Sequence, residues 1–347
     1  MDKTGEEKRK LGAFYTKSNV ITDYIVSKLP IEYGQKVLEP CVGDGEFIKA
    51  ILKKDIKLDI SAFDIDPLPI QYLNKEYPQI KSLVKNTLLE EEIPEYDIIL
   101  GNPPYGAEFN KEEENIYKKK YKEINVTESY ALFLINCIKR LKEEGILSFI
   151  ISDTFLHLNN HAKLRKFILD NCKIREIILL KTKLFPDVNY QYAGLCIISL
   201  QKCSSETERE KNKLRFINRL NDIVQLDNLI NLPINAIPDF VNSELINQNE
   251  YSHFVDNVFF QAGIPRNILN LFLDHTKLVE DLVKCKTGIY SGDNKRHFRI
   301  IENSKETKKF VNAGYKTVNE KEVVKRILTL KEKKEGIIQK PYFVPLM

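Results

Sequence analysis

The chain has 347 residues, 43% of them hydrophobic, which is enough for two domains with sizeable cores. It has no run of about 18 apolar residues and no apolar signal segment, so we expect neither a membrane span nor a secretion signal. The six cysteines form no CxxC pair, so we expect no structural zinc and a reduced, cytoplasmic setting. The formal net charge of +4 is too small to identify a partner by itself.

The first elements predict a Rossmann-like beginning. After a charged segment at 1–10, an apolar pattern from Val20 to Leu29 indicates a helix, and Lys36–Glu39 reads as a short buried strand. In the next loop, Gly43 and Gly45 allow the backbone to approach a ligand, and the helix that follows runs to Leu52 and offers free N–H groups. The loop lacks the G-x-G-x-x-G spacing of dinucleotide binders, and G-x-G alone is a weak signal.

A second strand, Leu58–Phe63, is followed at once by Asp64. This carboxylate lies 19 residues after Gly45, where a doubly wound fold places the acid that binds ribose hydroxyls. An aspartate in a plain turn at the end of a strand is the alternative. A further strand near Ile80–Val84 leads to Asn86.

The most informative segment is Asn102–Tyr105, Asn-Pro-Pro-Tyr, which follows the apolar strand Asp97–Leu100. The two prolines fix φ and keep the residue before each of them extended, so the strand ends in a rigid elbow at the sheet edge where α/β proteins bind ligands. A turn that merely ends the strand is the simpler reading, but the whole tetrapeptide after a buried strand favours function.

The chemistry that needs this elbow is methylation of a planar exocyclic amine. The Asn102 side-chain oxygen and the Pro103 carbonyl can each accept an N–H bond from such an amine, which concentrates its lone pair for attack on a sulfonium methyl group. Tyr105 supplies a flat face for a base that has left its stack.

Strands and helices continue to alternate in the remainder of the first two thirds. Residues 111–125 are highly charged without a clear period, which indicates either a mobile loop or a solvated insertion. The later elements are a helix Glu128–Leu141 capped by Gly145, a strand Ile146–Ile151, a helix Ala162–Leu169, and an antiparallel pair Ile174–Leu180 and Tyr192–Leu200. This order predicts a doubly wound α/β sheet.

The carboxyl-terminal part is less regular and more basic. Residues 203–211 read as a polar hairpin or linker, and 213–245 show no clear pattern. From Ile246 onward the chain has 18 basic and 12 acidic residues, against 35 and 37 in the remainder. The glycine-bearing, basic turn Gly288–Phe298 could follow a DNA backbone, although an ordinary turn and a lysine-rich solvated surface explain these features as well.

Taken together, these motifs resemble the amino-type (N6-adenine) DNA methyltransferases, most closely the Eco57I/TaqI-like group of restriction-modification enzymes, over most of residues 10–300. The resemblance implies a Rossmann-like, S-adenosylmethionine-dependent methyltransferase domain with a doubly wound mixed sheet. It assigns the methionine part of the cofactor to Tyr15, Thr16, Glu39, Cys41, Gly43 and Gly45. It also assigns ribose binding to Asp64, and binding of the cofactor adenine to Ile65 and Asn86. At the position of Asn86, related proteins usually carry aspartate.

The resemblance also implies the catalytic residues, namely Asn102, Pro103, Pro104 and Tyr105. His161 falls where a relative places an aromatic residue that stacks, together with Tyr105, on the target adenine, while a helix-start histidine that faces solvent is the alternative. No metal is expected.

Two domains are expected, a methyltransferase domain over 1–245 and the first part of a DNA target-recognition domain over 246–347. Relatives continue beyond a segment like 340–346, so we expect this recognition domain to be incomplete. The expected partners are double-stranded DNA with a flipped adenine and, separately, a nuclease or a recognition subunit. Restriction by this chain itself is not expected.

The sequence therefore predicts an adenine-N6 DNA methyltransferase of a restriction-modification or related defence system. Two alternatives remain open. The first is a methyltransferase that acts on protein glutamine or an RNA amine. The second is a truncated, non-catalytic partner that binds DNA or another subunit.

Overall fold

The computed structural model describes residues 19–252, apart from 92–93, 125–127, 182–193 and 221, together with two short strands, β10 (Arg299–Ile301) and β11 (Lys316–Val318). The chain divides into two compact units, Met1–Arg266 and Asn267–Met347. In the second unit, β10 and β11 pair in parallel. The glycine-bearing turn expected over 288–298 lies outside the described residues, and the domain boundary at 245/246 stays a prediction.

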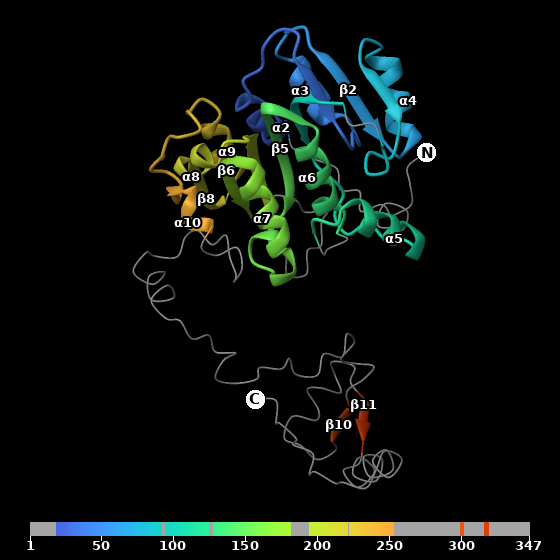
Figure 1. Cartoon of the computed structure of the whole chain (residues 1–347), viewed down its shortest axis with the longest axis vertical. Helices are drawn as coiled ribbons and strands as arrows, with labels where there is room; N and C mark the ends of the chain where they lie inside the picture. Colours follow the sequence, from blue (N-terminus) through green and yellow to red (C-terminus); the bar gives the residue numbers. More distant parts are fainter. Residues whose placement is uncertain are drawn as a thin grey trace. The chain divides into compact units, whose positions relative to one another are not determined.

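A nine-stranded mixed sheet forms the centre of the first unit, in the order β3-β2-β1-β4-β5-β7-β6-β8-β9 (Figure 1). Neighbours from β3 to β5 run parallel, whereas β7 is antiparallel to both β5 and β6. The predicted doubly wound mixed sheet and its antiparallel pair are thereby confirmed. The strands are β1 (Lys36–Glu39), β2 (Asp59–Asp64), β3 (Lys81–Val84), β4 (Tyr96–Gly101), β5 (Leu141–Ser152), β6 (Cys172–Leu180), β7 (Leu195–Lys202), β8 (Lys213–Leu220) and β9 (Ser243–Asn247).

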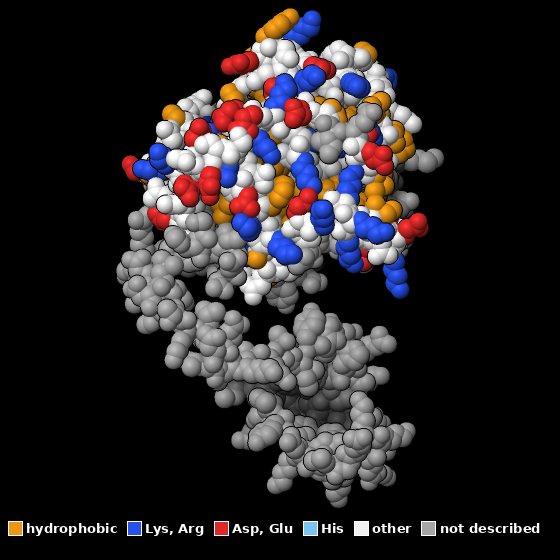
Figure 2. Space-filling model, in the orientation of Figure 1, with side chains coloured by type: hydrophobic (Ala, Val, Ile, Leu, Met, Phe, Trp, Pro, Cys, Tyr) orange, Lys and Arg blue, Asp and Glu red, His pale blue; other side chains and the backbone are white. Residues whose placement is uncertain are grey.

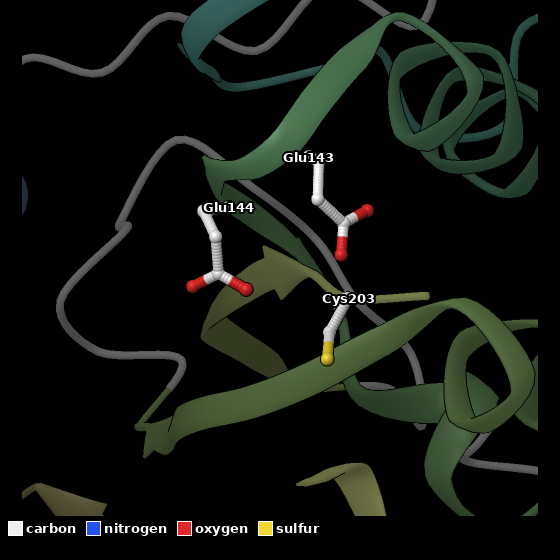
Figure 3. Close-up of side chains that lie close together, drawn as sticks. All are labelled: Glu143, Glu144 and Cys203. Atoms are coloured by element: carbon white, nitrogen blue, oxygen red, sulfur yellow. The ribbon is translucent and has the colours of Figure 1, made fainter. Parts of the chain in front are cut away.

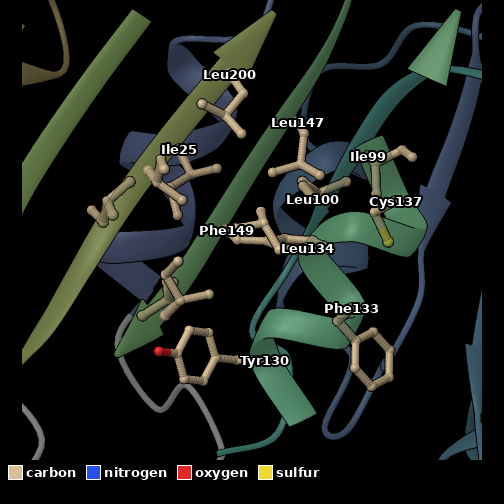
Figure 4. Packing of buried hydrophobic residues seen from close by; sticks show 14 of the residues in the cluster. Ile25, Ile99, Leu100, Tyr130, Phe133, Leu134, Cys137, Leu147, Phe149 and Leu200 are labelled. Atoms are coloured by element: carbon tan, nitrogen blue, oxygen red, sulfur yellow. The ribbon is translucent and has the colours of Figure 1, made fainter. Parts of the chain in front are cut away.

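Helices cover the sheet, and their apolar sides supply much of the core. Helix α2 contacts α3 and α9, whereas α6 contacts α7. Figure 4 shows Ile25 of α2 and Leu134 of α6 packed around sheet residues such as Leu147 and Phe149. The helices are α2 (Asn19–Ser27), α3 (Glu46–Leu52), α4 (Pro67–Glu76), α5 (Lys111–Lys120), α6 (Ser129–Lys139), α7 (Ala162–Asn171), α8 (Glu206–Lys211), α9 (Ile223–Leu229) and α10 (Gln248–Ser252).

The structure corrects the expectation of an irregular segment over 111–125, because α5 forms there. A capping box at its N-terminus stabilises this helix. The Asn110 side chain accepts from the backbone N–H groups of Glu112 and Glu113, and the Glu113 side chain accepts from the N–H of Asn110. Acidic residues fill the first turn and lysines the last, which suits the helix dipole.

The structure also corrects the role of Gly145, which lies inside β5 and caps no helix. A Cβ atom at this position would lie 2.9 Å from the carbonyl oxygen of Lys142 and 3.1 Å from those of Tyr96 and Asp97. Glycine is therefore required by the close approach of neighbouring backbone. Residues 213–245, which showed no pattern, extend the sheet through β8 and β9, with α9 between them.

Polar contacts join α2 and the residue after it, Lys28, to β6, β8 and residues 229–232. The Nζ atom of Lys28 donates to three carbonyl oxygens within 229–232, at 2.6–2.8 Å. The Tyr24 hydroxyl donates to Glu176 Oε1 at 2.6 Å and accepts from Arg215 Nη2 at 2.9 Å. Glu176 and Arg215 form a fully buried ion pair, so this end of the core holds compensated charges.

The exterior of the described region is charged and mixed in sign. Lysine and arginine side chains are interspersed with aspartate and glutamate on the face shown in Figure 2. In the described part of the chain, no helix combines the length and apolar character needed to cross a bilayer.

Candidate functional site

A cavity of about 190 Å³ opens at the carboxyl ends of β1, β2, β3 and β4. Four loops line it, one from each strand, within 39–47, 64–66, 85–88 and 102–109. In an α/β sheet the carboxyl ends of neighbouring parallel strands meet at one edge. Residues of the predicted cofactor loop and of the predicted catalytic elbow therefore line the same cavity.

Asp64 joins two of these loops. Its Oδ2 accepts from the Gly43 N–H at 2.9 Å, and its Oδ1 accepts from the Asp66 N–H at 2.8 Å. Gly43 and Gly45 both adopt positive φ, 50° and 72°, in the left-handed region that side chains rarely enter. The glycines thus allow the turn, and the aspartate holds it beside the cavity.

Glu39 lies at the floor of the cavity with 1% of its surface exposed. Its Oε2 has no hydrogen-bond partner among the described residues. Burial raises the pKa of this carboxyl well above its ordinary value, and the negative charge of Asp64 raises it further. A cationic group in the cavity would offset both effects.

The Asn102–Tyr105 elbow follows β4, and two of its four residues reach the cavity. Asn102 and Pro104 line the space, and both are partly exposed. The Tyr105 hydroxyl donates to the carbonyl of Ile150 at 2.8 Å and contacts Asn102 Oδ1. The Tyr105 ring is 8% exposed, so its stacking role, like that of the whole motif, stays a prediction.

Asn86 and Ile65 take positions on two further sides of the cavity. The Oδ1 of Asn86 accepts from the Leu88 N–H at 3.0 Å, and its Nδ2 donates to the Tyr117 hydroxyl at 3.3 Å. Ile65 is 55% exposed and lines the cavity next to Asp64. Cys41 also lines the cavity, as a free thiol.

Among the described residues predicted for the site, Gly45, Pro103, Tyr105 and His161 do not line the cavity. Tyr15 and Thr16 lie outside the described residues. His161 is fully buried: its Nε2 lies 2.7 Å from a Glu128 carboxylate oxygen, and its ring stacks on Tyr130, with the centroids 5.8 Å apart. The solvent-facing alternative for His161 is therefore wrong, and its role on the target base stays a prediction.

Sequence reasoning missed several lining residues, among them Lys85, Phe109 and Tyr117. Phe109 and Tyr117 are in edge-to-face contact, with their centroids 4.8 Å apart. Phe109 lies just before α5 and Tyr117 within it, and the Asn110–Glu113 capping box was the sequence signal that could have placed them beside the elbow.

The charge of the cavity is strongly one-sided. Among the lining residues, Lys85 is the only base, and it pairs with Glu90. The acids are Glu39, Asp44, Glu46, Asp64, Asp66, Glu108 and Glu113. Such a lining suits a cationic ligand such as a sulfonium with an ammonium group, and it disfavours the phosphates of a dinucleotide.

A separate acidic group is formed by Glu143, Glu144 and Cys203 (Figure 3). None of the three lines the cavity. Glu143 Oε1 accepts from the Ser204 N–H at 2.8 Å, and Glu144 Oε2 accepts from Gln201 Nε2 at 2.8 Å. These local bonds account for both carboxylates, and we assign the group no function.

Comparisons with known proteins show which family part of this chain resembles. The family model of the Eco57I restriction-modification methylase matches residues 45–185. The type II methyltransferase M.AccI of Acinetobacter calcoaceticus is 26% identical over 251 residues, which cover 69% of this chain and 44% of that protein. M.BstVI of Geobacillus stearothermophilus is 25% identical over 340 residues, which cover 83% of this chain and 60% of that protein.

Among solved structures, the type IIG restriction endonuclease BpuSI is similar in fold, with a TM-score of 0.56 at 15% identity, over 71% of this chain and 32% of that one. The chain thus spans only part of the length of its relatives. The resemblance and the fold class expected from the sequence are confirmed, and the matched methylase family supports S-adenosylmethionine as the methyl donor. Residues 45–185 are therefore similar to the Eco57I restriction-modification methylases, and the mixed α/β sheet fits the fold expected for such enzymes.

Proposed function

We propose that this chain transfers a methyl group from S-adenosylmethionine to the N6 atom of adenine in DNA, as part of a restriction-modification or related defence system. One observation carries the proposal: the Asn102 amide and the Asp64 carboxylate line the same acidic cavity. The matched methylase family and the type II methyltransferase relatives support it.

The donor fits the residues that are present. Asp64, with the loop that it holds through Gly43, would bind the ribose, and Ile65 and Asn86 would face the adenine. Glu39, which has one unpartnered buried oxygen among the described contacts, would face the cationic part. When bound, the donor supplies an electrophilic methyl group.

The elbow would hold the acceptor. Asn102 Oδ1 and the Pro103 carbonyl would accept the two N–H bonds of the adenine amino group, orient its nitrogen and raise its reactivity. The bond to the Ile150 carbonyl anchors Tyr105 to β5, and the Tyr105 hydroxyl contacts Asn102 Oδ1, so Tyr105 would help to orient the amide. His161 would join Tyr105 against the flipped base only after its ring leaves Glu128.

The test is transfer of a radiolabelled methyl group to unmethylated DNA, followed by nucleoside analysis. We expect label in N6-methyladenine with the wild-type chain, and a loss of at least about 100-fold in Asn102→Ala. Asn171→Ala is the matched control, because Asn171 is also a partly buried asparagine with an intact local bond, to Phe167, and does not line the cavity.

The other readings are distinguishable outcomes of the same assay. Label in protein or RNA, with none in DNA, would favour the alternative methyl acceptors. Binding of the donor without any transfer would favour a non-catalytic partner. Label in N4-methylcytosine would support a DNA methyltransferase but would show that its target is cytosine and not adenine.

A further inference from the structure

Ser129, the first residue of α6, is bonded to the catalytic elbow. Its Oγ donates to the carbonyl of Pro104 at 2.6 Å and accepts from the N–H of Ala107 at 3.4 Å. The two backbone groups lie on either side of Tyr105 in the sequence. Ser129 is 1% exposed and lines the cavity.

The elbow needs such an external partner. Pro103 and Pro104 have no N–H groups, so this stretch cannot be held by an ordinary ladder of backbone bonds. Beyond the end of β4, the described bonds that reach the 104–107 segment from other elements come from Ser129 and, through Tyr105, from Ile150 of β5. Ser129 and Ile150 are therefore two of the anchors of this segment.

The Ser129 hydroxyl is not used as a helix cap. The residue before α6 is Glu128, which makes no side-chain capping bond, and its carboxylate pairs with His161 instead. A serine near a helix start commonly bonds the free N–H groups of the first turn. Here the hydroxyl turns away from its own helix and towards the elbow.

We propose that Ser129 is a positioning residue for methyl transfer, which clasps Pro104 and Ala107 so that Tyr105 and Asn102 keep the geometry needed for the acceptor amine. The inference rests on the proposed function. Small displacements of reacting groups cost large factors in rate. Ser129 lines the cavity but is not one of the residues proposed to hold the donor, so its loss should slow transfer more than it weakens donor binding.

The variants are Ser129→Ala, which removes the clasp, and Ser129→Thr, which keeps a hydroxyl. Ser148→Ala is the matched control, because Ser148 is also a buried serine whose side chain is bonded, to Ser199 Oγ at 3.0 Å, and lies outside the cavity. Hydrogen exchange of the backbone amides of 105–107 reports on the clasp without any need for activity. Single-turnover methyl transfer and the Kd of the donor report on its consequence.

We expect Ser129→Ala to speed exchange of the 105–107 amides and to slow methyl transfer by roughly 10–100-fold, with the donor Kd changed less than about threefold. Ser129→Thr should restore most of the rate, and Ser148→Ala should leave both readouts at wild-type values. This combination separates positioning from general destabilisation.

Unchanged exchange in Ser129→Ala would overturn the clasp, even with a fully active wild-type chain. Faster exchange with an unchanged transfer rate would overturn the positioning role and leave the proposed function standing. A wild-type chain that methylates no DNA would overturn the proposed function and the catalytic half of this inference, while the exchange measurement still decides whether Ser129 holds the elbow.

Discussion

Replacing the buried carboxyl of Glu39 by an amide, Glu39→Gln, should change how stability depends on pH. Burial, with Asp64 nearby, raises the pKa of Glu39 in the folded protein above its ordinary value of 4.5. The folded chain therefore keeps a proton that the unfolded chain has already lost. Stability from the protonated form is fully present below about 4.5, and it is lost as the pH rises through the folded-state pKa.

The magnitude follows from the linkage of one proton. A difference of one bound proton changes the free energy of unfolding by about 1.4 kcal/mol per pH unit. The amide introduced by Glu39→Gln does not titrate. As the pH rises from about 5, the free energy of unfolding of the variant should therefore increase relative to that of the wild type, by up to about 1.4 kcal/mol per pH unit. Any constant offset from altered hydrogen bonds, such as that with the Ile48 backbone, does not affect the slope.

Urea unfolding of both proteins at a series of pH values between about 5 and 8 measures this slope. Glu143→Gln is the control, because Glu143 is exposed and its bonds to Ser204 lower its pKa. The difference in free energy of unfolding between Glu143→Gln and the wild type should therefore be constant over this pH range. Parallel curves for Glu39→Gln and wild type would mean that Glu39 is ionised in the folded protein, and the reasoning would fail. The same variant should bind the cationic donor more weakly at the alkaline end of the series.

Two further predictions concern the partly buried carboxylate of Asp64 and the buried carboxylate of Glu176. Asp64→Asn keeps the shape of the side chain but replaces one of the two oxygens that accept from Gly43 and Asp66. The Kd of the donor, measured by calorimetry, should therefore rise by about 10–100-fold. An unchanged Kd would refute the ribose role. Glu176→Gln leaves the buried Arg215 guanidinium without its carboxylate, so the free energy of unfolding in urea should fall by about 3–5 kcal/mol, and a loss below about 1 kcal/mol would show that the pair is not structurally important.

The sequence was most informative where local rules decide the structure. The strand Lys36–Glu39 forms with the predicted bounds, and the Asp97–Leu100 strand lies within β4, because short apolar runs ended by proline or glycine leave little choice. The rule that ligands bind at the carboxyl ends of parallel strands correctly brought Asp64 and Asn102 to one cavity.

The misses share a different cause, because they depend on charges or on distant partners. Helix α5 has little apolar periodicity and rests on its caps and terminal charges, so a search for apolar periods overlooks it. Strands β8 and β9 carry interrupted apolar runs, and their pairing is decided by neighbours far away in the chain. Ser129 looks like an ordinary helix-start serine, since its partner Pro104 lies 25 residues earlier.

The bonds of α2 have a consequence for the order in which the chain folds during synthesis. Lys28 finds its acceptors 201 to 204 residues later, and Tyr24 meets Arg215 across a separation of 191. A nascent chain that has left the ribosome only as far as β7 contains α2, its neighbour α3 and the Asn102 elbow, but it lacks the acceptors of Lys28 and the Arg215 partner of Tyr24. Completion of this unit is therefore expected to wait for translation of residues 213–232, and a nascent chain halted before them should be a ready target for chaperones and proteases.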